Sequence, residues 1–233
     1  MKKLLSAVCV ASLSLSSLMA HALWVEKEGD ATRVFFGDWD KDSKELTGKR
    51  LDNIKAKTVL PQGVGTEASR EYDHIFIQTK HAGDVAVVEP IAPRKSRLAD
   101  TVGRTLYMGR AGRSENKALL PLDLVPVAPH SNEFTVMLKG EPLPRASVTL
   151  WGPPKWSIAL RSDDAGKVTF KTPWKGEYLA QVRHVDESKG EVDGVAYDQT
   201  TYAMSLNFSV EKGIGWEIPL MIAQNNSVGG GHV

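Results

Sequence analysis

The sequence predicts an all-β protein, built as two β-sandwich domains that follow a signal peptide. Three observations support this prediction. Short runs rich in β-branched and aromatic residues recur along the chain, glycine, proline, asparagine and aspartate separate them, and helical periodicity is scarce. Such a density of short strands is typical of sandwiches rather than of folds that alternate strands with helices.

The strand signals extend from the start of the mature chain to its end. Leu23–Glu26 has the composition of a strand, and one or two helical turns are expected within Ser43–Leu51, where polar residues precede two leucines. The clearest strand segments are Thr32–Phe36, His74–Gln78, Asp84–Val88, Thr105–Gly109, Glu133–Leu138, Ser147–Trp151, Ser157–Arg161, Lys167–Lys171, Glu177–Arg183, Tyr202–Val210 and Trp216–Ile222.

Residues 1–22 are expected to be a secretory signal peptide, which predicts a periplasmic protein. Two lysines near the start, an apolar stretch over Leu4–Leu18 and small residues after it form the pattern. The stretch is too short to cross roughly 30 Å of hydrocarbon, so no transmembrane segment is expected in the mature chain. Cleavage after Ala22 fits the small-residue rule best. Cleavage after Ala20 would instead make His21 the N-terminal residue, whose amine and imidazole together can chelate a metal.

Composition excludes several classes of function. The only cysteine lies in the signal segment, so the mature chain has no thiol nucleophile, thiolate metal site or disulfide. The formal net charge of the whole chain is +1, without the basic excess of nucleic-acid-binding proteins. No spacing joins a nucleophile to a base, which predicts a protein that is not an enzyme. A locally basic segment is expected to be a solvated face or loop; it contains Arg94, Lys95, Arg97, Arg104, Arg110 and Arg113.

A domain boundary is expected near Pro121–Pro129, where three prolines favour an extended connector. The N-terminal β domain would then cover 23–122, the C-terminal sandwich 127–223, and a flexible tail 224–233. Turns are expected at Lys139–Pro142, Asp163–Gly166 and Pro173–Gly176, each with a glycine at a position that needs a left-handed backbone.

The C-terminal part resembles the transthyretin-like or carboxypeptidase-regulatory sandwich, an Ig-like architecture. The shared pattern is a pair of strands, then a turn that contains aspartate and glycine, then a strand that starts with glycine and tyrosine. The residues that carry it are Gly140, Pro142, Leu143, Ala146, Val148, Leu150, Asp163, Gly166, Gly176 and Tyr178. The resemblance implies an architecture and no particular function, because that fold is a general scaffold.

Several segments together resemble domain-of-unknown-function family 4198, a group of exported bacterial proteins. The segments are Ala20–Trp24, Val34–Trp39, Gly48–Ile54, Leu122–Pro126, Gly152–Trp156, Thr172–Gly176 and His184–Asp198. Some members accompany nickel or cobalt uptake systems, and others are encoded near outer-membrane receptors of the iron type. The resemblance therefore implies a non-enzymatic accessory protein of transition-metal uptake or homeostasis, with an envelope transporter or receptor as a partner. The chain departs from the family at Gln199–Ala203, where many relatives have a histidine.

Histidine and carboxylate ligands are the predicted means of binding a metal. His184 is the leading candidate, because it ends a predicted strand two residues before Asp186. Nitrogen and oxygen donors of this kind suit Ni, Co, Cu, Zn or Fe without selecting among them. No two histidines have a tight ligand spacing, so the remaining candidates would have to meet through the fold; they are His21, His74, His81 and His130.

Two alternative functions remain open on the sequence alone. Trp151 and Trp156 flank a Pro-Pro loop, and with the basic segment 94–113 they predict a metal-free adaptor for an envelope protein or glycan. An N-terminal His21 with a second imidazole such as His184 would predict a copper oxidase. The acidic segment Asp38–Asp42 lacks the later ligands of a calcium loop and is expected to be a solvated turn.

Overall fold

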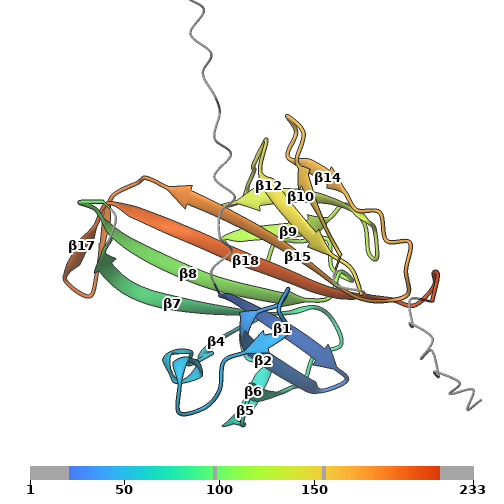
Figure 1. Ribbon diagram of the computed structural model, residues 1–233, viewed down its shortest axis with the longest axis horizontal. Coiled ribbons are helices and arrows are strands. Elements are labelled where there is room, and N and C mark those ends of the chain that lie inside the picture. Colours follow the sequence, from blue (N-terminus) through green and yellow to red (C-terminus); the bar gives the residue numbers. More distant parts are fainter. Residues whose placement is uncertain (1–20, 97–98, 154–155, 216–233) are drawn as a thin grey trace, which may run out of the picture.

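A computed structural model describes residues 21–96, 99–153 and 156–215, and strands dominate these ranges (Figure 1). The described residues contain no α-helix, and a single 3₁₀ turn spans Arg50–Asn53. The prediction of an all-β fold is confirmed. In these ranges no helix has the length and apolar character needed to span a bilayer.

The N-terminal sheet has the strand order β1 (Ala22–Glu28), β2 (Ala31–Asp38), β6 (Ile75–Thr79) and β5 (Gly65–Arg70), and β3 (Ser43–Lys44) pairs with β2. All of these pairings are antiparallel, with β1 and β2 joined by a tight hairpin. Side chains from one face of this sheet form an apolar cluster with residues around the 3₁₀ turn and with the strand Val85–Lys95.

A seven-stranded sheet runs through the centre of the molecule. Its strand order is β13 (Ser157–Arg161), β12 (Ser147–Trp151), β15 (Gly176–Asp186), β18 (Gln199–Val210), β8 (Val102–Ala111), β7 (Val85–Lys95) and β4 (Thr58–Leu60). The pairing of β8 with β18 is parallel, and the neighbouring pairings are antiparallel. Strands far apart in the sequence therefore lie side by side at the middle of this sheet (Figure 1).

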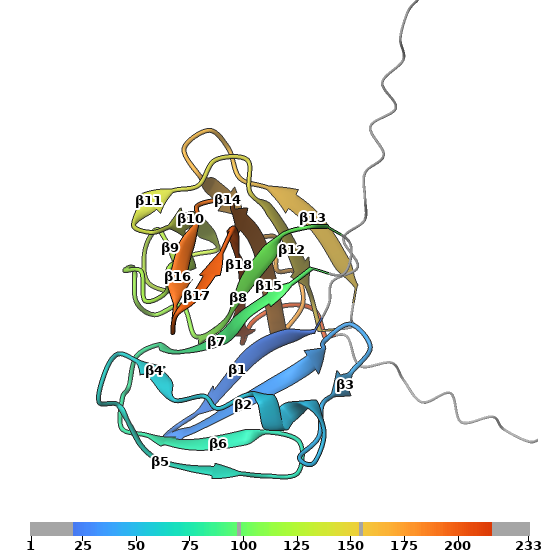
Figure 2. The same ribbon diagram turned by 90° about the vertical axis from the view of Figure 1, so that its left-hand side faces the viewer.

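The third sheet contains β9 (Leu122–Pro126), β10 (Glu133–Leu138), β11 (Glu141–Pro142) and β14 (Lys167–Thr169). It covers one face of the central sheet, and the N-terminal sheet covers part of the other face (Figure 2). A hairpin of β16 (Gly190–Val192) and β17 (Val195–Tyr197) completes the structure. The largest core lies between the central and third sheets and includes Met108, Leu124, Phe134, Tyr178 and Leu206.

Strand β1 is buried on both faces because two packing layers meet at it. Leu23 and Val25 join the core beneath the N-terminal sheet, whereas Trp24 points the other way and packs with Phe35. Gly109 on β8 allows this close approach. A Cβ atom there would lie 2.7 Å from a Val25 methyl carbon and 2.8 Å from a Leu23 methyl carbon, too close for any residue but glycine.

Most predicted strands are present, and the differences have local causes. The expected connector Pro121–Pro129 contains a full strand, β9, because its prolines stand before and at the end of the paired residues rather than among them. The expected helical segment starts as strand β3, and its only helical turn comes at Arg50–Asn53. The turn glycines at 140, 166 and 176 have positive φ, as expected.

Some sequence predictions concern residues beyond those described. The signal segment up to residue 20, the strand expected at Trp216–Ile222 and the tail lie outside the described residues. The division into two domains stays a prediction. The predicted boundary coincides with β9, and the central sheet joins strands that precede that boundary to strands that follow it.

A buried charge cluster connects the central sheet to the third sheet. Arg110 on β8 has no solvent exposure and lies between Asp84 and Asp123, which are 1% and 0% exposed. Its Nη2 donates to Asp84 Oδ2 over 2.6 Å, and its Nη1 donates to Asp123 Oδ2 over 3.0 Å. The expectation of a solvated basic segment is therefore wrong at Arg110, because two buried carboxylates compensate for the loss of water. The expected 94–113 loop is largely strand, since β8 covers Val102–Ala111.

Backbone groups complete this cluster. Burial raises the pKa of Asp123, and Arg110 and the backbone N–H groups of Leu119, Leu120 and Leu124 oppose that shift. Asp84 accepts hydrogen bonds from the N–H and hydroxyl of Ser114. The segment between β8 and β9 is thus held by the same carboxylates that hold Arg110.

We expect Arg110→Met to destabilise the fold by about 3–5 kcal/mol, because it leaves buried carboxylates without their cation. Urea unfolding followed by circular dichroism measures this loss. Arg145→Met is the matched control, since Arg145 pairs with Asp164 in solvent at exposures of 73% and 84%. A midpoint for Arg110→Met equal to that of the control would contradict the proposed role of the cluster.

Candidate functional site

The predicted metal ligands are spread over several parts of the fold. Among the described residues no group of three or more histidine, aspartate or glutamate side chains is arranged to hold a metal ion. Each predicted histidine therefore has to be assessed with its own neighbours. His21, His74 and His81 have carboxylate partners, and the structure brings His184 and Asp186 to one face of β15.

His21 lies immediately before β1, where two carboxylates contact opposite edges of its ring. Glu45 Oε1 forms a short hydrogen bond with Nε2, and Asp38 Oδ1 lies 3.5 Å from Nδ1. Arg50 Nη1 is 3.3 Å from Nε2 and 3.7 Å from Glu45 Oε1. Glu45 thus forms an ion pair with Arg50. Because a guanidinium only donates, the Nε2 atom of His21 faces both a donor and an acceptor.

His21 also borders an open pocket of about 680 Å³ between the 3₁₀ turn and β7. Phe36 packs against the imidazole with ring centroids 5.3 Å apart, and Tyr107 packs against Phe36. Side chains of Arg50, Lys55 and Arg94 line the same pocket. The imidazole is thus held by aromatic packing and carboxylates, with an edge open to solvent-accessible space.

Two other histidines form local ion pairs. His74 Nδ1 lies 2.7 Å from Asp73 Oδ1, and this hydrogen bond is the largest cause of the lowered pKa of Asp73. His81 Nε2 lies 3.1 Å from Glu115 Oε1. The first contact is between adjacent residues, and the second joins the segment before β7 to the segment after β8. Each ring has a single carboxylate beside it, which is the arrangement of a structural hydrogen bond.

His130 has a backbone role. Its φ is +62°, its N–H donates to the Arg113 carbonyl over 2.7 Å, and its own carbonyl accepts from Arg113 Nη1 over 2.6 Å. The residue fixes the turn after β9 against the segment after β8. Its side chain lines a pocket described below.

His184 and Asp186 lie on β15 two residues apart, so they point to the same face. His184 is half-buried opposite Tyr202. The Asp186 carboxylate is already engaged, since Lys139 Nζ lies 2.5 Å from Oδ2 and the Ser188 N–H donates to Oδ1. Lys139 is the largest cause of the lowered pKa of Asp186. A metal shared by this pair would have to displace Lys139.

The tryptophans mostly stabilise the interior. Trp151 is 7% exposed and packs with Trp24, Phe35 and Leu179, so its indole is unavailable to a partner. Trp156 packs against Trp174 at a centroid distance of 5.0 Å and against the main core.

In the acidic segment, the Asp42 N–H donates to the Trp39 carbonyl, as expected for a turn.

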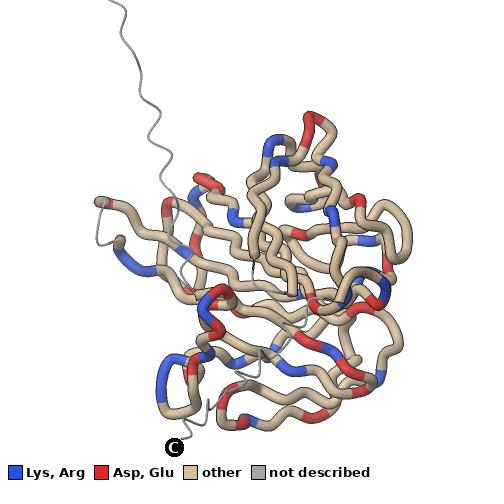
Figure 3. The backbone as a smooth tube through the Cα atoms, turned by 45° about the vertical axis from the view of Figure 1, so that its right-hand side comes forward, with Lys and Arg blue, Asp and Glu red and all other residues tan. Residues whose placement is uncertain are grey.

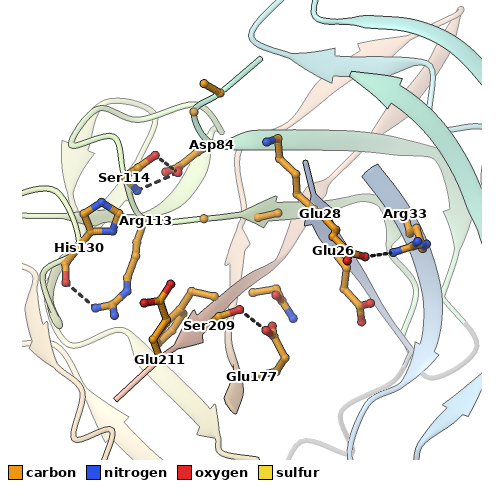
Figure 4. A pocket seen from close by; sticks show the side chains of 17 residues that line it. Glu26, Glu28, Arg33, Asp84, Arg113, Ser114, His130, Glu177, Ser209 and Glu211 are labelled. Carbon is orange, nitrogen blue, oxygen red and sulfur yellow. Dashed lines mark hydrogen bonds and ion pairs between the residues drawn. The ribbon is translucent and has the colours of Figure 1, made fainter. Parts of the chain in front are cut away.

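A second pocket, of about 540 Å³, was not indicated by the sequence. Figure 4 shows side chains from four places around it: Glu26 and Glu28 on β1, Arg33 on β2, Glu177 and Ser209 on β15 and β18, and Arg113 and Ser114 after β8. Ser209 donates to Glu177 across the paired strands. Burial is the main cause of the raised pKa of Glu177, and the nearby charge of Glu26 adds to it.

Sequence reasoning missed this pocket because its residues come from segments spread along the chain from Glu26 to Glu211. The only local signal is the alternation of Glu26 and Glu28, which puts both on one face of β1. In the view of Figure 3, acidic and basic residues are interspersed along the described chain.

Comparisons with protein-family models, with curated proteins and with solved structures found no match for this chain. The resemblance to family 4198 therefore stays a prediction.

We expect Lys139→Met to raise the pKa of the Asp186 carboxyl toward its ordinary value of 3.8, because it removes the largest stabilising partner of the ionised form. A carboxyl-detected NMR titration of both proteins measures this. In the unmodified protein the ion pair contributes to stability above the ordinary pKa, and that contribution is lost as the pH falls toward the lowered value. Identical titration curves would show that Lys139 does not hold Asp186.

Proposed function

We propose that this chain is an exported, non-enzymatic accessory protein of transition-metal uptake or homeostasis in the bacterial envelope, and that His21 at the mature N-terminus is its metal ligand. The observation that carries the proposal is the pair of carboxylates on opposite edges of the His21 imidazole. The resemblance to an exported family associated with metal uptake supports the same class of function.

The start of the fold favours cleavage after Ala20. Ala22 is the first residue of β1 and pairs with Gly37, and His21 contacts Glu45 and Asp38. Cleavage after Ala22 would remove both residues and their contacts, whereas cleavage after Ala20 keeps them. The retained His21 would then present its free amine beside its Nδ1 atom.

The donor atoms around His21 fit a divalent transition metal. The amine and Nδ1 of an N-terminal histidine close a chelate ring, and Asp38 Oδ1 lies 3.5 Å from Nδ1. That distance is long for a hydrogen bond but close to the roughly 3.4 Å edge between two ligands of a tetrahedral ion with bonds near 2.1 Å. With Nδ1 bound to a metal, Nε2–H would donate to Glu45, as metal-bound histidines do to second-shell carboxylates. Copper, nickel, cobalt and zinc suit this donor set.

The remaining alternatives receive less support. A copper oxidase would need a second imidazole at His21. On β15, His184 points to the same face as Val182, whose side chain belongs to the main core. His21 borders the same strand around Gln181–Arg183. His184 therefore points away from His21 through the sheet. A metal-free adaptor that binds its partner through tryptophans could not use Trp151, because that side chain is buried.

The test is calorimetric titration of Cu²⁺, Ni²⁺, Co²⁺ and Zn²⁺ into the exported protein. We expect at least one metal to bind with a Kd below about 10 μM, and His21→Ala to weaken that binding by at least about tenfold. A chain that retains Ala20 before His21 should also bind more weakly, because its histidine has lost the free amine. His184→Ala, which leaves the N-terminus intact, should bind as the unmodified protein does.

Intact-mass spectrometry of the exported protein provides an independent check of its first residue. A mature chain that begins at Leu23 would refute the proposed site outright. Equal metal binding by His21→Ala and the unmodified protein would refute it as well, and a loss of binding in His184→Ala alone would transfer the site to β15.

A further inference from the structure

The pocket beside Glu26 and Glu177 has the properties of a second binding site, separate from His21. It lies at the opposite end of β1 from His21, where the N-terminal sheet, the end of β18 and the segment after β8 meet (Figure 4). Its volume of about 540 Å³ falls in the range of small-molecule sites.

Its carboxylates are incompletely compensated by cations. Glu28 forms an ion pair with Arg33 at 3.4 Å. Within the described ranges, no ion pair joins a lysine, arginine or histidine to the other three glutamates of the pocket: Glu26, Glu177 and Glu211.

Two basic residues beside the pocket do not pair with these glutamates. Nη1 of Arg113 donates to the carbonyls of His130 and Ser131, and its guanidinium lies 4.8 Å from the centre of the Phe208 ring. Lys27 also lines the pocket, but among the described residues no ion pair joins its ammonium to a glutamate. The three carboxylates therefore define an acceptor surface for a cation.

An independent observation indicates a ligand with an acceptor atom as well. Asn207 lines this pocket and is only 4% exposed, and its Nδ2 atom has no hydrogen-bond partner among the described residues. The amide lies near enough to Glu177 to favour the ionised carboxylate, but its geometry does not complete a hydrogen bond there. Leaving a buried donor without a partner costs about 1–3 kcal/mol, and a bound oxygen or nitrogen acceptor would recover it.

We infer that this pocket binds a small molecule bearing a primary ammonium group next to a hydrogen-bond acceptor, with Glu26, Glu177 and Glu211 receiving the ammonium and Asn207 donating to the acceptor. Free amino acids have this chemistry, since the α-carboxylate beside the ammonium can accept from Asn207. Putrescine, whose two nitrogens are both protonated, presents the ammonium without the acceptor.

Trp24 supplies a reporter, because its indole Nε1 donates to Glu26 Oε1 over 3.1 Å. The experiment is a titration of the chain beginning at His21 with L-lysine, with putrescine and with the uncharged 1,4-butanediol, followed by the ¹H–¹⁵N signal of the Trp24 indole. Trp24→Phe assigns that signal. We expect a saturable shift with L-lysine at a Kd of about 1 mM or tighter, weaker binding of putrescine, and no saturable shift with the diol.

The Glu26→Gln/Glu177→Gln double variant should weaken binding by at least about tenfold, because it removes two charge-assisted contacts while keeping the side-chain shapes. Glu141→Gln, at an exposed turn far from the pocket, is the charge-matched control and should bind normally. If the double variant fails to fold, Glu177→Gln alone should weaken binding several-fold.

A putrescine affinity equal to or above that of lysine would contradict the role of Asn207 as a donor to the ligand. The inference is overturned if neither amine produces a saturable shift, if the diol binds equally well, or if the glutamine variants bind as tightly as the unmodified protein. Because His21 lies outside this pocket, a failure here leaves the metal proposal untouched, and the reverse also holds.

Discussion

The buried Arg110 between Asp84 and Asp123 determines how the central and third sheets of this protein meet. Removing three charged groups from water costs several kcal/mol each, and only complete mutual pairing makes that arrangement stable. Here Arg110 comes from the central sheet, Asp123 from the third sheet, and Asp84 from the residue before β7. Satisfying the carboxylates also uses N–H groups of Ser114, Leu119 and Leu120, so the connection from β8 to β9 follows one path. Arg113 belongs to this connection and lines the second pocket described above.

Strand β1 links this architecture to both proposed sites. Its first residue follows His21, and its last residues contribute Glu26 and Glu28 to the pocket at the other end. Burial on both faces keeps the strand rigid, and Gly109 permits β8 to pack against it closely. Two binding functions at the two ends of one rigid strand need no moving element, because the core between them fixes their positions.

The sequence predicted the all-β class and most strands, because alternation of apolar and polar residues is a local property. Glu133–Leu138 and Ser147–Trp151 coincide with β10 and β12. It did not predict the parallel pairing of β8 with β18, since pairing between distant strands depends on the whole core. The same limit explains why the sequence did not predict the arrangement of the sites. Arg110 resembles any exposed arginine until Asp84 and Asp123 approach it, and the carboxylates beside His21 come from turns 17 and 24 residues away. His184 and Asp186 lie on one face of β15, but the sequence did not indicate that Lys139 pairs with Asp186 there.

Native-state hydrogen exchange tests the organising role of the charge cluster most directly. The amides of Ser114, Leu119, Leu120 and Leu124 donate to its carboxylates. If the cluster holds the sheets together, these amides open only when the whole protein unfolds, and their protection equals that of the central strand β18. Exchange of these amides at the rate of an exposed loop, while β18 stays protected, would contradict the account.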